Sequence, residues 1–126
     1  MPKIDQRPPV WIGHMFLATT DVEKTATFMR KLGMRDIFQS ESIVVLELRG
    51  GTHLLLQPTD DPIPPGTKAP FDLMVDEIDA SHEKFEELGL SPSTIEDGRI
   101  HRSFTIFDPS GYEITVNSSH VSNLPV

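Results

Sequence analysis

An internal repeat limits the possible folds of this chain more than any other feature of the sequence. Two segments show the same expected order of strand, helix and three further strands. Adding 56 to a residue number carries Leu17 onto Leu73 and Gly33 onto Gly89, and after the helix an offset of 60 carries Gly51 onto Gly111. Two repeats of ~50 residues are too few for a solenoid. The repeat therefore predicts two small modules related by a pseudo-two-fold axis.

Both expected helices are marked by their end residues. The first begins after Thr20 or Asp21, either of which is a good N-cap, and ends at Gly33. The second covers residues 79–88 and ends at Gly89. Hairpin turns are expected at residues 50–51 and 109–111. The expected strands are residues 11–19, 35–39, 42–48, 52–57, 71–75, 93–96, 102–107 and 112–117.

The repeat and the prolines give the domain organisation. Residues 58–70 contain five prolines and a glycine, which is the composition of a linker. We expect one domain over residues 1–126, with module one at 11–57, module two at 71–118 and a tail at 119–126. The predicted fold class is α+β, with two β-α-β-β-β modules that form a concave mixed sheet around a cavity. The linker permits the modules to pair within one chain or across a dimer.

Composition narrows the range of functions. The net charge of −8 disfavours nucleic-acid binding, because such a surface repels phosphate backbones. The absence of cysteine removes thiol catalysis and thiolate metal sites. No apolar run approaches the ~18 residues of a membrane-spanning helix, and the first residues lack the apolar region of a secretory signal. We therefore expect no membrane partner and a cytoplasmic location.

Two stretches of sequence resemble the vicinal oxygen chelate superfamily. The first is His14 followed by the strand, cap and helix of residues 15–34. The second is the closing segment 102–115, with its Asp108-Pro109-Ser110-Gly111 turn. The superfamily includes glyoxalase I, fosfomycin- and bleomycin-resistance proteins and extradiol dioxygenases. The resemblance implies a single glyoxalase-like domain, a small-molecule ligand between the modules and a homodimer.

The resemblance also implies four positions for metal ligands. Carried onto this sequence by the repeat offsets, they are His14, Leu55, Pro70 and Thr115. Of these, His14 alone is a good ligand, and three or four protein ligands are the norm. We therefore expect no bound metal. The alternative is a shifted set of His14, His53 and Glu113 that holds a divalent Zn, Ni, Mn or Fe ion.

The remaining site residues follow from strand alternation and the resemblance. Residues two apart on a strand face the same way, so His53 and Gln57 share a face with Leu55, and Asn117 shares one with Thr115. The resemblance to fosfomycin-resistance proteins directs Ser103 and Thr105 toward the ligand. A merely solvated polar face is the other interpretation. The expected ligand pocket consists of His53, Leu55, Gln57, Ser103, Thr105, Thr115 and Asn117.

His14 and His101 are the candidate catalytic residues, because an unperturbed imidazole titrates near neutral pH. The expected function is binding of a small organic ligand without the metal, either to sequester it or for metal-free acid/base chemistry. The alternative is a metal-dependent lyase of the lactoylglutathione lyase type, or an extradiol dioxygenase, with the shifted ligands. The sequence leaves open whether the protein is an enzyme.

Overall fold

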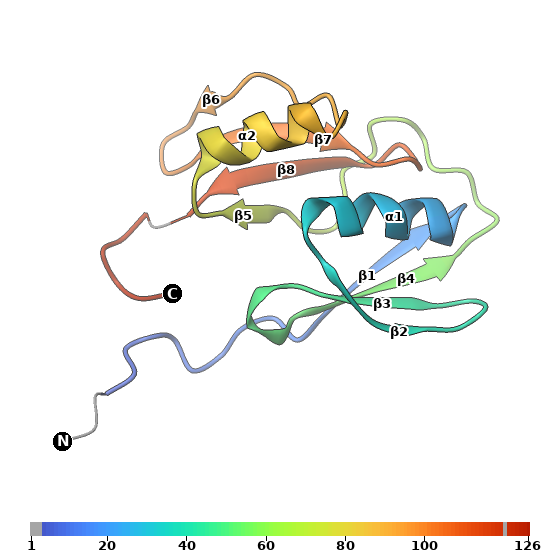
Figure 1. Ribbon diagram of the computed structural model, residues 1–126, viewed down its shortest axis with the longest axis horizontal. Helices are drawn as coiled ribbons and strands as arrows, with labels where there is room; N and C mark the ends of the chain where they lie inside the picture. The colour runs from blue at the N-terminus through green and yellow to red at the C-terminus, as the bar shows by residue number, and fades with distance from the viewer. Residues whose placement is uncertain (1–3, 120) are drawn as a thin grey trace.

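A computed structural model describes residues 4–119 and 121–126. It contains two modules that each run strand, helix, strand, strand, strand (Figure 1). Met1 to Lys3 and His120, which lie in the predicted domain and tail, are outside the described residues. Module one consists of β1 (His14–Thr19), α1 (Val22–Leu32), β2 (Arg35–Gln39), β3 (Val44–Glu47) and β4 (His53–Pro58), with a 3₁₀ turn at Arg49–Gly51. Module two consists of β5 (Leu73–Val75), α2 (Ile78–Glu87), β6 (Glu96–Asp97), β7 (Arg102–Phe107) and β8 (Glu113–Ser118).

Each module forms its own mixed four-stranded sheet. The strand orders are β1-β4-β3-β2 and β5-β8-β7-β6, so the two sheets have equivalent topologies. In each sheet the first and last strands of the module pair in parallel, and the other pairs are antiparallel. The predicted α+β class and the repeated β-α-β-β-β order are confirmed.

The ends of α1 follow from its capping residues. Asp21 has an extended backbone, and its side chain accepts a hydrogen bond of 3.0 Å from the backbone N–H of Lys24. At the other end Gly33 has φ of 113°, a left-handed conformation that favours glycine. Between the caps, Ala26 and Met29 are fully buried.

Strand alternation gives each sheet a buried face and an open face. In module one Leu17, Leu54 and Leu56 are buried, and in module two Ile114 and Val116 are buried. The alternate residues of the same strands are half-buried or exposed. In module two the buried face lies under α2, where the Phe85 and Phe104 rings meet edge to face at 5.8 Å. The open faces carry the side chains that are free to meet a ligand.

The modules meet where β1 ends and where the β7–β8 turn closes. The hydroxyl of Tyr112 donates a hydrogen bond of 2.8 Å to the carbonyl oxygen of Ala18. The buried hydroxyls of Thr19 and Thr25 lie within hydrogen-bonding distance of the Ser110 hydroxyl. We call these five residues the module seam. Figure 1 shows α1 beside this turn, so the helix contacts the second module as well as its own sheet.

Two segments differ in detail from the expected strands. The strand expected at 93–96 is reduced to β6 at Glu96–Asp97. Ser93 still lies along β7: its N–H donates to the Thr105 carbonyl at 2.9 Å, and its hydroxyl accepts from the Thr105 N–H at 2.8 Å. A side chain thus replaces the backbone acceptor of a regular ladder. Near the end of the predicted linker, Lys68 forms an isolated bridge with Glu113.

Candidate functional site

The open face of module one carries a row of three polar side chains. Strand register sets His14 of β1 opposite His53 of β4, and His53 opposite Glu47 of β3. The two imidazole rings have centroids 5.6 Å apart and meet at 69°. His53 Nε2 lies 3.0 Å from Glu47 Oε2. We call these three residues the histidine row.

Arg35 binds the row's carboxylate and lowers its pKa. Its guanidinium donates to Glu47 Oε1 through Nε at 2.7 Å and through a second, shorter contact from Nη2. These bonds, and then the contact with His53, hold the pKa of Glu47 below its ordinary value. Glu47 therefore stays an acceptor, and Oε2 accepts from His53 Nε2–H. In a neutral His53 ring this leaves Nδ1 with its lone pair free.

The row lies beside apolar side chains. Phe16 and Leu55 are paired in the register one step along the same face from His14 and His53. Gln57 lies a further step along β4. The open face of module one thus combines a few placed polar groups with an apolar surface, as small-molecule sites do.

The open face of module two carries the other predicted pocket residues. Ser103 is paired with Asn117, and Thr105 with Thr115, so all four side chains share this face and are half-buried. A hollow of about 390 Å³ lies at the start of β8. It is lined by Lys68, Ala69, Pro70, Phe71, Asp72, Glu113 and Thr115. Thr115 is the member of the predicted pocket that lines it.

The structure therefore brings the predicted residues together in two sets, one on each sheet. His14, His53, Leu55 and Gln57 belong to module one, and the other set belongs to module two. The hydrogen bonds across the module seam do not involve either set. The predicted single cavity between the modules stays a prediction.

His101 lies outside both sets. It precedes β7, and its Nδ1 is 2.6 Å from the carbonyl oxygen of Ser118 at the end of β8. This contact gives the ring a structural partner where β7 begins and β8 ends. Its predicted catalytic role stays a prediction. Glu47, in contrast, was not among the predicted residues. It becomes visible once β3 and β4 are paired in register, because the pairing sets it opposite His53.

Residues 11–116 match the model of the Glyoxalase/Bleomycin resistance protein/Dioxygenase superfamily. This match covers module one, the predicted linker and all but the last two residues of module two. The chain belongs to that superfamily. No curated protein matches the sequence.

Solved structures of other proteins share the fold at low sequence identity. A lactoylglutathione lyase from Agrobacterium tumefaciens is 22% identical, with a TM-score of 0.72 over 90% of this chain and 96% of its own. TnmS3, an antibiotic-binding protein from Streptomyces sp. CB03234, is 21% identical, with a TM-score of 0.74 over 86% of this chain and 95% of its own. A superfamily member from Sphaerobacter thermophilus DSM 20745 is 19% identical, with a TM-score of 0.72 over 87% and 98% of the two chains. These likenesses extend to the fold alone.

Within one chain, the described residues do not bring the three ligands of the shifted set together, and the expectation of no bound metal stays a prediction. Within residues 4–119 and 121–126, no group of three or more His, Cys, Asp or Glu side chains is arranged to hold a metal ion. His14 and His53 are neighbours, but Glu113, the third member of the shifted set, lies on the other sheet beside Lys68. Glu47 is nearer, and Arg35 already occupies one of its oxygens. In the same described part of the chain, neither helix is long and apolar enough to cross a membrane.

Proposed function

We propose that this superfamily member binds a small organic ligand on the open face of module one, where the histidine row supplies acid/base chemistry without a metal. One observation carries the proposal: His53 lies between a second imidazole and the Glu47 carboxylate, which Arg35 holds through its other oxygen. Apolar Phe16 and Leu55 beside the row provide a surface for the body of the ligand.

The chemistry follows from the order of the row. Glu47 Oε2 accepts a hydrogen bond from His53 Nε2–H and orients the ring, so Nδ1 is the atom that takes a proton from a bound ligand. A carboxylate that fixes an imidazole in one tautomer also stabilises the imidazolium formed by that transfer. His14 is exposed at the edge of the row and is the group that returns a proton. Thus His53 is the base, His14 the acid and Glu47 the positioning residue.

We further propose a homodimer in which the open faces enclose the ligand. Both faces expose large apolar side chains: Phe16 is 55% exposed, Met74 63% and Phe107 53%. Such residues are costly to leave in water when they are grouped on one surface. A second copy that covers these faces would bring the two predicted pocket sets to one cavity and exclude water from the histidine row.

The proposal is tested by ligand screening with matched histidine variants. Wild type, His53→Gln, Glu47→Gln and a control, His82→Gln on α2, are titrated with a panel that includes lactoylglutathione and antibiotics, the ligand classes in the relatives' names. A ligand that binds the native state raises the unfolding temperature. We expect at least one compound to stabilise wild type and the control, and to lose affinity in His53→Gln.

The same samples decide between the metal-free proposal and the metal-dependent alternative. Metal content is measured on purified protein before and after incubation with Zn²⁺, Ni²⁺, Mn²⁺ and Fe²⁺, for wild type and His14→Ala. The metal-free proposal predicts less than one tightly held ion per chain, with no change in the variant. One ion per chain that disappears in His14→Ala would establish the alternative lyase or dioxygenase. Equal ligand affinity in wild type and His53→Gln would overturn the proposed site.

A further inference from the structure

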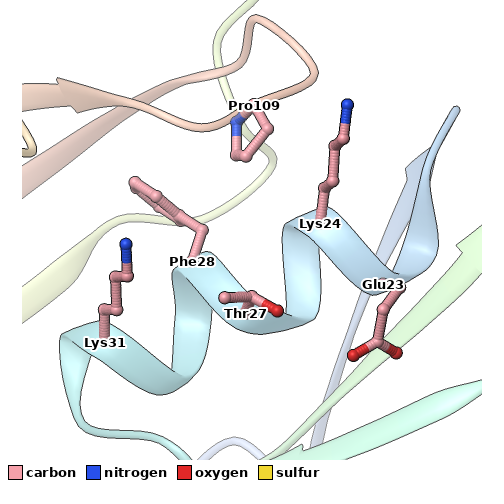
Figure 2. A pocket seen from close by; sticks show the side chains of 6 residues that line it. All are labelled: Glu23, Lys24, Thr27, Phe28, Lys31 and Pro109. Atoms are coloured by element: carbon pink, nitrogen blue, oxygen red, sulfur yellow. The ribbon is translucent and has the colours of Figure 1, made fainter.

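A second hollow lies on the opposite side of α1 from its sheet, away from both open faces. It has a volume of about 260 Å³ and is lined by Glu23, Lys24, Thr27, Phe28, Lys31 and Pro109. Five of these residues belong to α1, and Pro109 belongs to the β7–β8 turn, so the hollow spans the junction of the modules. Figure 2 shows the side chains of Lys24 and Lys31 on the same side of the helix, with Phe28 between them.

The helical repeat accounts for this arrangement. Lys24 and Lys31 are seven residues apart, which is about two turns and about 10 Å along the axis. Phe28 falls four residues after the first lysine and three before the second, so it lies on the same face. Phe28 is almost completely buried, and Pro109 faces it from the other module. The hollow therefore has an apolar centre between two cationic ends.

The charges around the hollow are unbalanced. Within the described part of the chain, no ion pair involves Lys24 or Lys31. The carboxylate at the rim, Glu23, is directed away from the lysines and is 3.2 Å from Arg30 Nη1 and 3.3 Å from Gln39 Nε2. In a chain with a net charge of −8, this is a local positive site without an acidic partner.

We propose that this hollow binds a small amphipathic carboxylate, with its apolar part on Phe28 and Pro109 and its carboxylate on Lys24 or Lys31. A wholly apolar ligand would leave both ammonium groups unused, and a cation would be repelled by them. The small volume favours a short chain or a single ring over a large ligand. Phe28 belongs to module one and Pro109 to module two. The bound ligand therefore contacts both modules, next to Ser110 of the module seam.

The test uses hexanoate as the probe and hexylammonium as its charge-reversed control. Backbone amide shifts of the ¹⁵N-labelled full chain are followed during titration of each compound. We expect saturable shifts with hexanoate at residues 23–31 and at Asp108, Ser110 and Gly111, and none of them with hexylammonium. The affinity should weaken at high salt, since exposed charges are screened.

Two double variants separate the site from a general charge effect. Lys24→Gln/Lys31→Gln should weaken hexanoate binding at least about threefold, as expected for exposed charge contacts. The control, Lys84→Gln/Arg99→Gln, removes the same charge elsewhere and should bind as wild type does. The proposal is overturned if hexanoate shifts only residues of the open faces, if hexylammonium shifts the same amides, or if no amide responds. These variants do not change the histidine row. The result of this test is therefore independent of the test of the proposed function.

Discussion

Glu47 joins a permanent cation and a titratable ring through its two oxygens. Arg35 occupies Oε1, and His53 occupies Oε2. The two contacts act in the same direction, because each favours the ionised carboxylate. The side chain of Glu47 is 14% exposed and that of Arg35 is 78% exposed. Arg35 therefore covers the solvent side of Glu47, and the sheet covers its other side.

Removal of the arginine should be visible in the titration of Glu47. In Arg35→Gln we expect the pKa of Glu47 to rise toward its ordinary value of 4.5, since the largest cause of its lowering is gone. The carboxyl ¹³C shift followed against pH measures this. Arg102→Gln, which removes an arginine paired with Asp79 and Asp97 in module two, is the matched control and should leave Glu47 unchanged.

The direction of this shift also fixes a dependence of stability on pH. A carboxyl whose pKa is lower in the folded than in the unfolded state stabilises the fold above its unfolded value. For Glu47 this stabilisation is present above about pH 4.5 and is lost as pH falls through the lower, folded-state pKa. Urea unfolding at pH 7 and pH 3 should show a smaller loss in Arg35→Gln than in wild type. An equal loss in both proteins would contradict this assignment.

The residues of the site were only partly predictable from sequence. His14 and His53 could be named because the resemblance implies ligand positions at His14 and Leu55, and alternation puts His53 on the same face as Leu55. Glu47 could not, because its meeting with His53 depends on the register of β3 against β4. Arg35 depends on a further pairing, with Arg35 opposite Glu47 across β2 and β3. Each additional strand pairing adds a register that one sequence does not specify.

At the scale of elements, the helix ends provide a comparison within one molecule. Asp21 caps α1 with a side-chain hydrogen bond to Lys24 N–H, whereas Glu77 occupies the same position of α2 without a side-chain cap bond. The two modules thus use the same topology with different terminal chemistry. In the first turn of α1 the N–H of Lys24 is satisfied by the cap side chain. In α2 the cap side chain satisfies no N–H.

This difference predicts unequal costs for the same substitution. Asp21→Ala should lower the free energy of unfolding by about 1 kcal/mol, because it removes the side-chain acceptor. Glu77→Ala should cost less than about 0.5 kcal/mol, as expected where no such bond exists. Urea denaturation of both variants and wild type measures the two values. Equal costs would show that the cap bond of Asp21 contributes nothing measurable.

Most elements were predictable from local signals, and the exceptions have physical reasons. Gly33 and the N-cap fixed the limits of α1 because both ends have specific residue chemistry. The strand expected at 93–96 shifted to Glu96–Asp97 because Ser93 contacts Thr105 through its side chain. The Ser93 hydroxyl accepts the hydrogen bond that a backbone carbonyl would accept in a regular strand pair. The sequence pattern of a strand is therefore kept although the backbone pairing is interrupted.

At the scale of the whole molecule, the internal repeat predicted two equivalent modules, and the two strand orders confirm them. The way in which the modules meet was not predictable, because it depends on a few side chains of the seam. The contacts of Tyr112 with Ala18 and of Ser110 with Thr19 join residues more than 90 positions apart. The repeat offsets compare equivalent positions and carry no information about contacts between the two copies.

The proposed homodimer makes a prediction about mass in solution. Wild type should elute with about twice the chain mass of 14.1 kDa in light-scattering chromatography. Met74 and Phe107 are both exposed on the open face of module two. The variants Met74→Lys and Phe107→Lys should shift toward the monomer mass, because each would bury a charge in the dimer interface. Ile100→Lys, an exposed apolar residue outside the strands, is the control and should keep the mass of wild type. A monomeric wild type would contradict the enclosed cavity.

The module seam also has a consequence for synthesis on the ribosome. Thr19 and Thr25 complete their hydroxyl contacts only with Ser110, and the carbonyl of Ala18 receives its bond from Tyr112. A nascent chain can pack the apolar face of α1 against β3 and β4 long before these partners emerge from the exit tunnel. During that interval the Ala18 carbonyl lacks its Tyr112 donor, the hydroxyls of Thr19 and Thr25 bond each other but lack Ser110, and Phe28 is not yet faced by Pro109. The closing turn of module two is therefore the segment whose arrival ends the exposure of module one to chaperones and proteases.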